Sequence, residues 1–104
     1  MKRDHIIDKI KEKMKMLVPK ASIILFGSEA RGEARIDSDI DLLFLIPDEY
    51  NKIYNDIRIE IMNELYLLEL EFNVLISPIV LLQKMWDEKV TPFTINVEKD
   101  GILL

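Results

Sequence analysis

Asp39 and Asp41 have the residue type and the spacing that a metal ion requires. They begin an apolar stretch, residues 39–46 (DIDLLFLI), that is typical of a buried strand. Alternate side chains of a strand share a face, so both carboxylates would project from one side while Ile40 points into the core. Adjacent carboxylates repel each other unless a cation lies between them, and Mg²⁺ is a hard cation that binds carboxylate oxygens. The alternative is a pair of exposed acids at the start of an edge strand.

A glycine and a serine, Gly27 and Ser28, follow a short apolar run that predicts another buried strand, residues 22–26. Glycine directly after a strand adopts torsion angles that other residues resist, and it lets a ligand approach the backbone. Ser28 adds a hydroxyl group, and a helical turn starting after it would present N–H groups that favour phosphate oxygens. Arg31 lies between two glycines and is better placed than Arg35 to add positive charge. Taken by itself, the Gly-Ser dipeptide favours an ordinary end to a strand.

Several other kinds of site are excluded by composition. The chain has no cysteine, which excludes disulfides, thiolate zinc sites and cysteine nucleophiles. Its one histidine, His5, cannot supply a histidine-rich metal site, and a Ser-His-Asp triad is not expected. The P-loop pattern is absent, because no lysine follows either glycine, and a dinucleotide-binding fingerprint would need a long helix after the glycines.

Charge is unevenly distributed along the 104 residues. The net charge is −5, but residues 1–20 hold seven Lys or Arg against three Asp or Glu, so the remainder carries −9. An acidic body argues against a nucleic-acid surface. The basic leading segment is either the solvated face of a helix or a contact surface for an acidic partner. We expect no membrane span and no signal peptide, and hence a cytoplasmic protein.

The order of predicted elements indicates one domain over residues 1–104, with an α/β or α+β fold in which helices pack against a small mixed sheet. The link between the first two strands is too short for a parallel crossover, so these strands should be antiparallel. A long helix should begin at Asp48, and another should run from Thr91-Pro92 to Gly101. The predicted helices are residues 4–17, 48–68, 80–88 and 92–100, and the predicted strands are residues 22–26, 39–46 and 72–77.

The two motifs together resemble the signature of the nucleotidyltransferase superfamily related to DNA polymerase β, and most closely its small "minimal nucleotidyltransferase" domains. The matching pattern is Gly27-Ser28-x-Ala30-Arg31-Gly32, then five residues, then Ser38-Asp39-x-Asp41-Leu42. The resemblance implies a polymerase β-like fold and Mg²⁺-dependent transfer of a nucleoside monophosphate, such as AMP from ATP, to a hydroxyl group. It implies that Asp39 and Asp41 are catalytic metal ligands. It also implies a nucleotide-binding set: Gly27, Ser28, Arg31, Gly32 and Ser38.

The resemblance also implies a third carboxylate on a later strand. With a strand at residues 72–77, the corresponding position is Asn73, whose amide can coordinate Mg²⁺ weakly but cannot accept a proton. The strand could also start earlier, at Leu70, and by strand alternation Glu71 and Glu69 would then share a face with Asn73. Glu71, two residues from Asn73, is the candidate for the third catalytic acid. Equally, Glu71 could be a solvent-facing strand residue.

Two functional hypotheses follow from the resemblance. The first is an active enzyme that modifies a partner protein or another acceptor, as in antitoxins that pair with a helical HEPN toxin. The second is a binding module of the same fold, with weak or no catalysis, that neutralises such a partner. A drug-modifying transferase is disfavoured because no second domain would form the cleft, and a purely structural domain would leave the motifs unexplained. The base preference and a homo-oligomeric state stay open.

Overall fold

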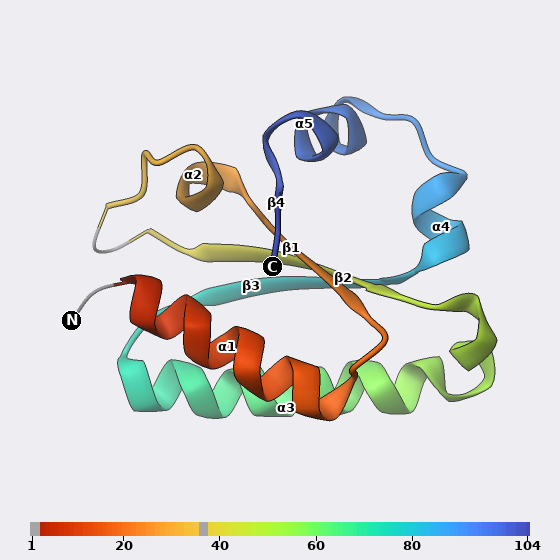
Figure 1. Ribbon diagram of the computed structural model, residues 1–104, viewed down its shortest axis with the longest axis horizontal. Coiled ribbons are helices and arrows are strands. Elements are labelled where there is room, and N and C mark those ends of the chain that lie inside the picture. Colours follow the sequence, from red (N-terminus) through yellow and green to blue (C-terminus); the bar gives the residue numbers. More distant parts are fainter. Residues whose placement is uncertain (1–2, 36–37) are drawn as a thin grey trace.

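A four-stranded mixed sheet forms the centre of the protein, whose computed structural model describes residues 3–35 and 38–104 (Figure 1). The strands are β1 (Ser22–Phe26), β2 (Ile40–Ile46), β3 (Ile76–Leu82) and β4 (Ile102–Leu103), in the order β3-β2-β1-β4. β1 pairs antiparallel with both β2 and β4, whereas β2 and β3 are parallel. The mixed sheet and the antiparallel first pair are as predicted; β4 was not predicted.

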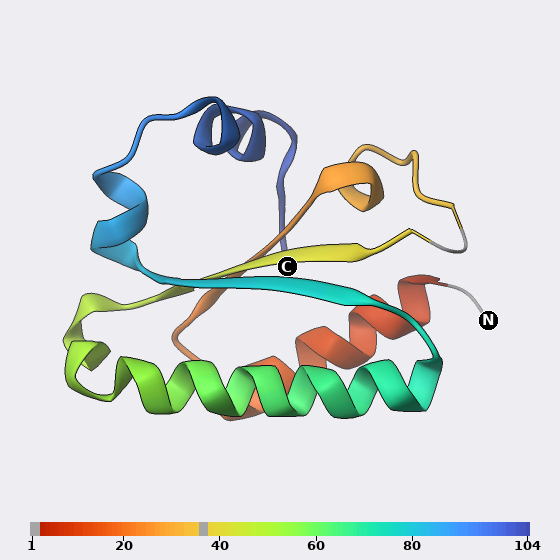
Figure 2. The same cartoon turned by 180° about the vertical axis from the view of Figure 1, so that it is seen from behind.

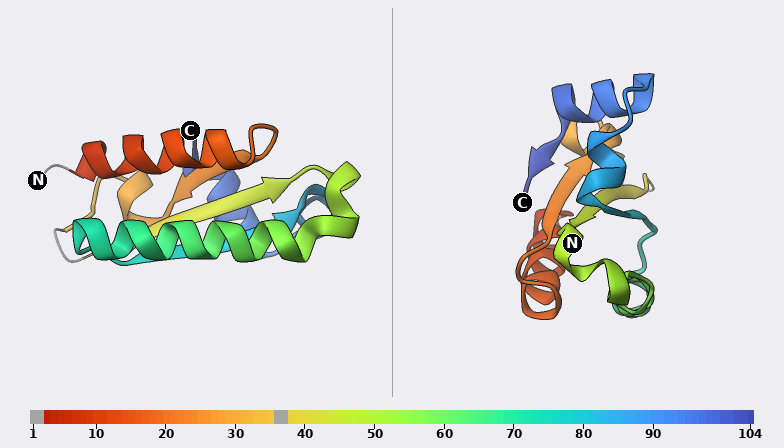
Figure 3. Two further views of the ribbon diagram at one scale, coloured as in Figure 1. Left: turned by 90° about the horizontal axis from the view of Figure 1, so that it is seen from below. Right: turned by 90° about the vertical axis from the view of Figure 1, so that its right-hand side faces the viewer.

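Two helices, α1 (Arg3–Leu17) and α3 (Tyr54–Phe72), lie side by side on one face of the sheet (Figures 1 and 3). Each buries the residues that recur at helical spacing in the sequence. The core between these helices and the sheet contains Ile6, Ile10, Met14, Ile23, Leu25, Ile40, Leu42, Phe44, Ile46, Ile61, Leu65, Leu68, Ile76, Val80 and Leu82. Burial of this face fixes which side of every strand is turned away from the two helices.

The opposite face is covered by α4 (Gln83–Asp87) and α5 (Pro92–Asp100) (Figure 2). A second buried cluster joins these helices to the sheet through Leu43, Leu45, Trp86 and Val97. α5 starts at Thr91, whose hydroxyl oxygen accepts a hydrogen bond from Thr94 N at 3.2 Å, and Gly101 follows its end. The predicted bounds of this helix are therefore confirmed.

The predicted bounds of the third strand were wrong, because α3 continues through Phe72 and the strand is Ile76–Leu82. Phe72 packs against the same core as Leu65 and Leu68, so the helical periodicity extends further than the β-forming residues suggested. Asn73 then ends the helix in the left-handed conformation with φ 53°, which asparagine tolerates better than most residues. The strand begins only at Ile76.

Two further predicted boundaries differ from the structure. β3 extends through Leu82, so only Gln83–Asp87 of the helix predicted at residues 80–88 is helical. Pro78 is tolerated inside β3 because this strand lies at the sheet edge. Asp48 does not cap α3 but begins a 3-10 helix, η1 (Asp48–Ile53), and its carboxylate accepts a hydrogen bond from Lys84 N at 2.9 Å. In the described residues, every helix is too short or too polar to span a bilayer.

Candidate functional site

Asp39 and Asp41 lie on the face of the sheet that α4 and α5 cover. In β2, Leu43 and Leu45 pack into the cluster around Trp86 on that face. The alternate residues of β2, beginning at Ile40, are buried against α1 and α3. Because side chains alternate along a strand, Asp41 lies on the first face and Ile40 points into the core as predicted. Asp39 precedes β2, and its hydrogen bond with Ser77, the residue paired with Asp41, places its carboxylate on the same side.

The glycine bend lies directly against one of these acids. Phe26, the last residue of β1, is paired with Asp41, which brings Gly27 beside the Asp41 side chain. A Cβ atom on Gly27 would lie 2.2 Å from Asp41 Oδ2, and Gly27 has φ +72°, a conformation that other residues rarely adopt. Only glycine therefore allows the backbone bend and the carboxylate to occupy adjacent space.

The short helix α2 (Gly27–Ala30) makes the predicted turn after β1. Its backbone is closed by hydrogen bonds from Arg31 N to Gly27 O at 3.2 Å and from Glu33 N to Ser28 O at 2.9 Å. The first N–H groups of a helical turn lack carbonyl partners within the helix, so they can bind phosphate oxygens. The turn thus presents this capacity beside Asp41.

The surroundings of Asp41 act on its pKa in opposite directions. Burial is the main cause that raises the pKa of Asp41, and the charge of Asp39 raises it further, whereas Arg31 lowers it. Each effect requires that the side chain concerned be near the Asp41 carboxyl group. Arg31 itself is exposed and donates a hydrogen bond from Nε to Glu33 Oε1 at 2.6 Å. Arg31, Asp39 and Asp41 therefore form one electrostatic group.

A serine that the sequence analysis missed lies next to the two acids. Ser77 is the residue of β3 that pairs with Asp41, and its hydroxyl donates a hydrogen bond to Asp39 Oδ2 at 3.2 Å. Phe26, Asp41 and Ser77 thus form one row across three strands. The signal in the sequence was the alternation in β3, where Ile76, Val80 and Leu82 are buried in the core and Ser77 falls on the other face.

The third-carboxylate assignment needs correction. Asn73 ends α3 and Glu71 lies exposed in the last turn of that helix, so the argument from strand alternation does not apply to either residue. Glu69, the other acid on the expected strand face, instead accepts a hydrogen bond from Ile76 N at 2.8 Å and fixes the connection to β3. The residue that β3 places beside Asp41 is Ser77, which bears no charge.

The remaining predicted nucleotide-binding residues, Gly32 and Ser38, lie in the loop between β1 and β2. Gly32 has φ +72°, but a Cβ atom there would meet nothing within 4 Å, so it serves the turn. Ser38 Oγ accepts a hydrogen bond from Arg35 N at 2.8 Å, just before the acids. Ile36 and Asp37 fall outside the described residues. The roles of Gly32 and Ser38 toward a nucleotide stay predictions.

The two carboxylates fit a magnesium ion that takes its other ligands from elsewhere. Across residues 3–35 and 38–104, no three Asp, Glu, His or Cys side chains gather as a metal-binding group. Mg²⁺ is commonly held by one or two carboxylates, with water and substrate phosphates completing six oxygen ligands. Asp39 and Asp41, close to each other and next to the turn of α2, suit that arrangement.

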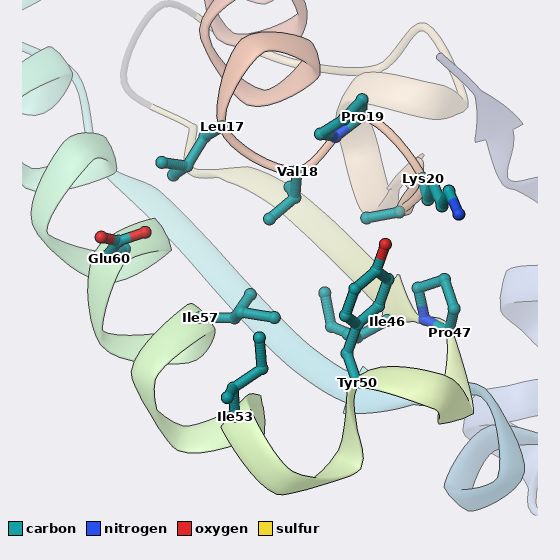
Figure 4. Close-up of a pocket in the computed structure, with 11 residues that line it drawn as sticks. Leu17, Val18, Pro19, Lys20, Ile46, Pro47, Tyr50, Ile53, Ile57 and Glu60 are labelled. Carbon is teal, nitrogen blue, oxygen red and sulfur yellow. The ribbon is translucent and has the colours of Figure 1, made fainter.

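Two cavities lie at opposite ends of the sheet. One, of about 180 Å³, lies between α2 and α5 and is lined by Gly27 and Arg31 on one side and by Phe93, Asn96 and Asp100 on the other. A larger apolar cavity, of about 250 Å³, lies where β2 ends at Ile46, and Figure 4 shows the side chains around it. The smaller cavity is lined by Gly27, which lies against Asp41, whereas the larger one lies at the other end of β2 from the aspartates.

The chain is similar to known proteins in sequence and in fold. The nucleotidyltransferase domain model matches residues 7–104. A toxin–antitoxin protein whose crystal structure contains AMP-PNP is similar to 95% of this chain and 69% of its own, with 23% identity and a TM-score of 0.61. A candidate nucleotidyltransferase from Sulfolobus solfataricus covers 95% of this chain and 76% of its own, with 24% identity and a TM-score of 0.56. Among curated proteins no match was found.

These similarities confirm the predicted fold, and the family model covers nearly the whole chain. The residues of the signature, from Gly27 to Leu42, fall inside the matched range. The protein is a member of the nucleotidyltransferase domain family.

Proposed function

We propose that the protein transfers a nucleoside monophosphate, AMP from ATP, to a hydroxyl group in a Mg²⁺-dependent reaction. The observation that supports this most is the contact between Gly27 and Asp41, where a Cβ atom would lie 2.2 Å from Oδ2. It joins a turn suited to phosphate to a pair of acids suited to a divalent cation. Neither half alone would distinguish a transferase from an ordinary strand and turn.

Each residue has a separate task in the proposed reaction. The turn at Gly27 and Ser28 binds the triphosphate, Arg31 adds positive charge, and Asp39 and Asp41 ligate the metal. When bound, Mg²⁺ neutralises charge on the phosphates and orients an in-line attack. A bond forms between the acceptor oxygen and the α-phosphorus, the bond to the β-phosphate breaks, and pyrophosphate leaves. The acceptor proton passes to a carboxylate of the site or to water.

For the acceptor, we propose a hydroxyl group on a helical partner protein of the HEPN type, with this chain as the antitoxin. The support is the similarity to a toxin–antitoxin protein solved with AMP-PNP, which at 23% identity shows the fold. The partner would therefore supply both the acceptor and part of its recognition. If this acceptor were wrong, the proposed nucleotide and metal would be unaffected.

A binding module with weak catalysis is the second candidate. The observation that favours it is Ser77, an uncharged residue where β3 faces Asp41. Two carboxylates can hold a nucleotide and a cation, but they provide fewer groups for activating an acceptor hydroxyl. A protein of this kind would bind its partner stoichiometrically and leave it unmodified.

Incubation with Mg²⁺, ATP labelled in its α-phosphate and a candidate partner protein of the HEPN type would separate these functions. The enzyme hypothesis expects label on the partner, and expects it to disappear in Asp39→Ala. A matched control is Asp56→Ala, because Asp56 is an exposed acid on α3, away from the sheet face that carries the site. Stable complex formation without label would support the binding module, and equal labelling by both variants would contradict the assignment of Asp39.

A further inference from the structure

Asp39 has an exposed side chain whose orientation must be held by a neighbouring group if it is to bind a cation. It precedes the first residue of β2, Ile40, so the strand pairing does not fix its carboxylate directly. Ser77 lies one strand away, and its hydroxyl group donates a hydrogen bond to Asp39 Oδ2 at 3.2 Å. The serine is itself held in the parallel ladder opposite Asp41. A residue fixed by the sheet thus reaches the more exposed of the two acids.

We propose that Ser77 is a positioning residue that holds the Asp39 carboxylate in place for a divalent cation shared with Asp41. Without this hydrogen bond, the exposed carboxylate would have to be ordered when the cation binds, and the loss of rotational freedom would weaken binding. Loss of a group that orients a metal ligand typically lowers metal affinity by about 10- to 100-fold. The inference rests on the proposed metal site and on no particular nucleotide or acceptor.

The hydrogen-bond direction supports this role. An ionised carboxylate only accepts, so the Ser77 hydroxyl must be the donor. The contact at 3.2 Å is long for two oxygens, which leaves room for the pair to tighten when a cation draws Asp39 into place. Ser77 therefore acts through Asp39 rather than on a substrate.

Titration with Mn²⁺ in the absence of nucleotide, followed by the EPR signal of the free ion, tests this role. Ser77→Ala should weaken Mn²⁺ affinity by roughly tenfold, the lower end of what loss of a ligand-orienting partner causes. Ser77→Thr keeps the hydroxyl group and should restore the affinity. Ser22→Ala is the matched control, because Ser22 is also a partly exposed strand serine but is paired with Leu45 at the other end of the sheet.

Thermal unfolding of each variant without metal checks that the fold is retained. Ser77→Ala binding Mn²⁺ as tightly as the wild type would overturn the proposal, and so would failure of Ser77→Thr to restore affinity in a folded protein. Absence of Mn²⁺ binding by the wild type would overturn both the positioning role and the metal site. If Mn²⁺ binding depends on Ser77 but no label is transferred, the positioning role stands and the transferase function fails.

Discussion

Replacing Gly27 with alanine would test the contact on which the site depends. The added Cβ atom would lie 2.2 Å from Asp41 Oδ2 and 3.1 Å from Asp41 Cγ, so the carboxylate must move. The carboxylate is the far end of a rotatable side chain, and moving it off its preferred rotamer costs about 0.5–1.5 kcal/mol. The variant should therefore fold, but with Asp41 turned away from the cation.

Gly32→Ala supplies the matched control. Both glycines have φ +72°, so both substitutions carry the cost of a left-handed backbone, about 1–2 kcal/mol. Only Gly27 has a neighbour within reach of the new methyl group. The two variants should thus have Tm values within several degrees of each other, since about 1 kcal/mol shifts the Tm of a domain of this size by about 4–8 °C.

The difference between the two variants should appear in cation binding. We expect Gly27→Ala to lose at least roughly tenfold in Mn²⁺ affinity, because a displaced ligand should cost no less than a lost orienting partner. Gly32→Ala should bind Mn²⁺ as the wild type does. The assays are thermal unfolding and Mn²⁺ titration on the same samples. Equal Mn²⁺ affinities in two folded variants would refute the argument that the bend and the acid share one space.

Two further substitutions test the electrostatics and a helix cap. Burial and the charge of Asp39 raise the pKa of Asp41, so the folded protein binds this proton more tightly than the unfolded chain, and stability falls as the pH rises through the folded pKa. In metal-free buffer at neutral pH, Asp41→Asn should therefore unfold at a higher denaturant concentration than the wild type. This difference in stability should disappear below the ordinary Asp pKa of about 3.9. A variant less stable than the wild type at neutral pH would contradict the argument. Thr91→Ala should cost about 0.5–2 kcal/mol of unfolding free energy through loss of the α5 cap, whereas Thr91→Ser should retain it.

Local patterns predicted most of the fold. The start of α5 follows from Thr91-Pro92, and α1 follows from the spacing of its apolar residues, because both signals lie within the element itself. The end of α3 did not follow, since residues 65–77 combine helical periodicity with β-forming residues. The core contacts of Phe72 and the left-handed conformation of Asn73 decide between the two, and both depend on tertiary structure.

The candidate site, like the fold, was predicted only in part from the sequence. Gly27, Asp39 and Asp41 lie within fifteen residues of one another and were predicted because one antiparallel pairing brings them together. Ser77 was missed because its position depends on the register between β2 and β3, which are separated by α3. No local pattern fixes that register, so the wrong strand boundary led to Glu71 and Asn73.

The pairing of β3 with β2 determines which side chains of β3 lie beside Asp41. A slip of one residue in the pairing of β3 with β2 would exchange the two faces of β3 and turn Ser77 toward the core, where Ile76, Val80 and Leu82 are buried. A slip of two residues would keep the faces but would move Ser77 away from Asp41. The apolar residues of β3 therefore set the position of a polar side chain on the opposite face of the same strand.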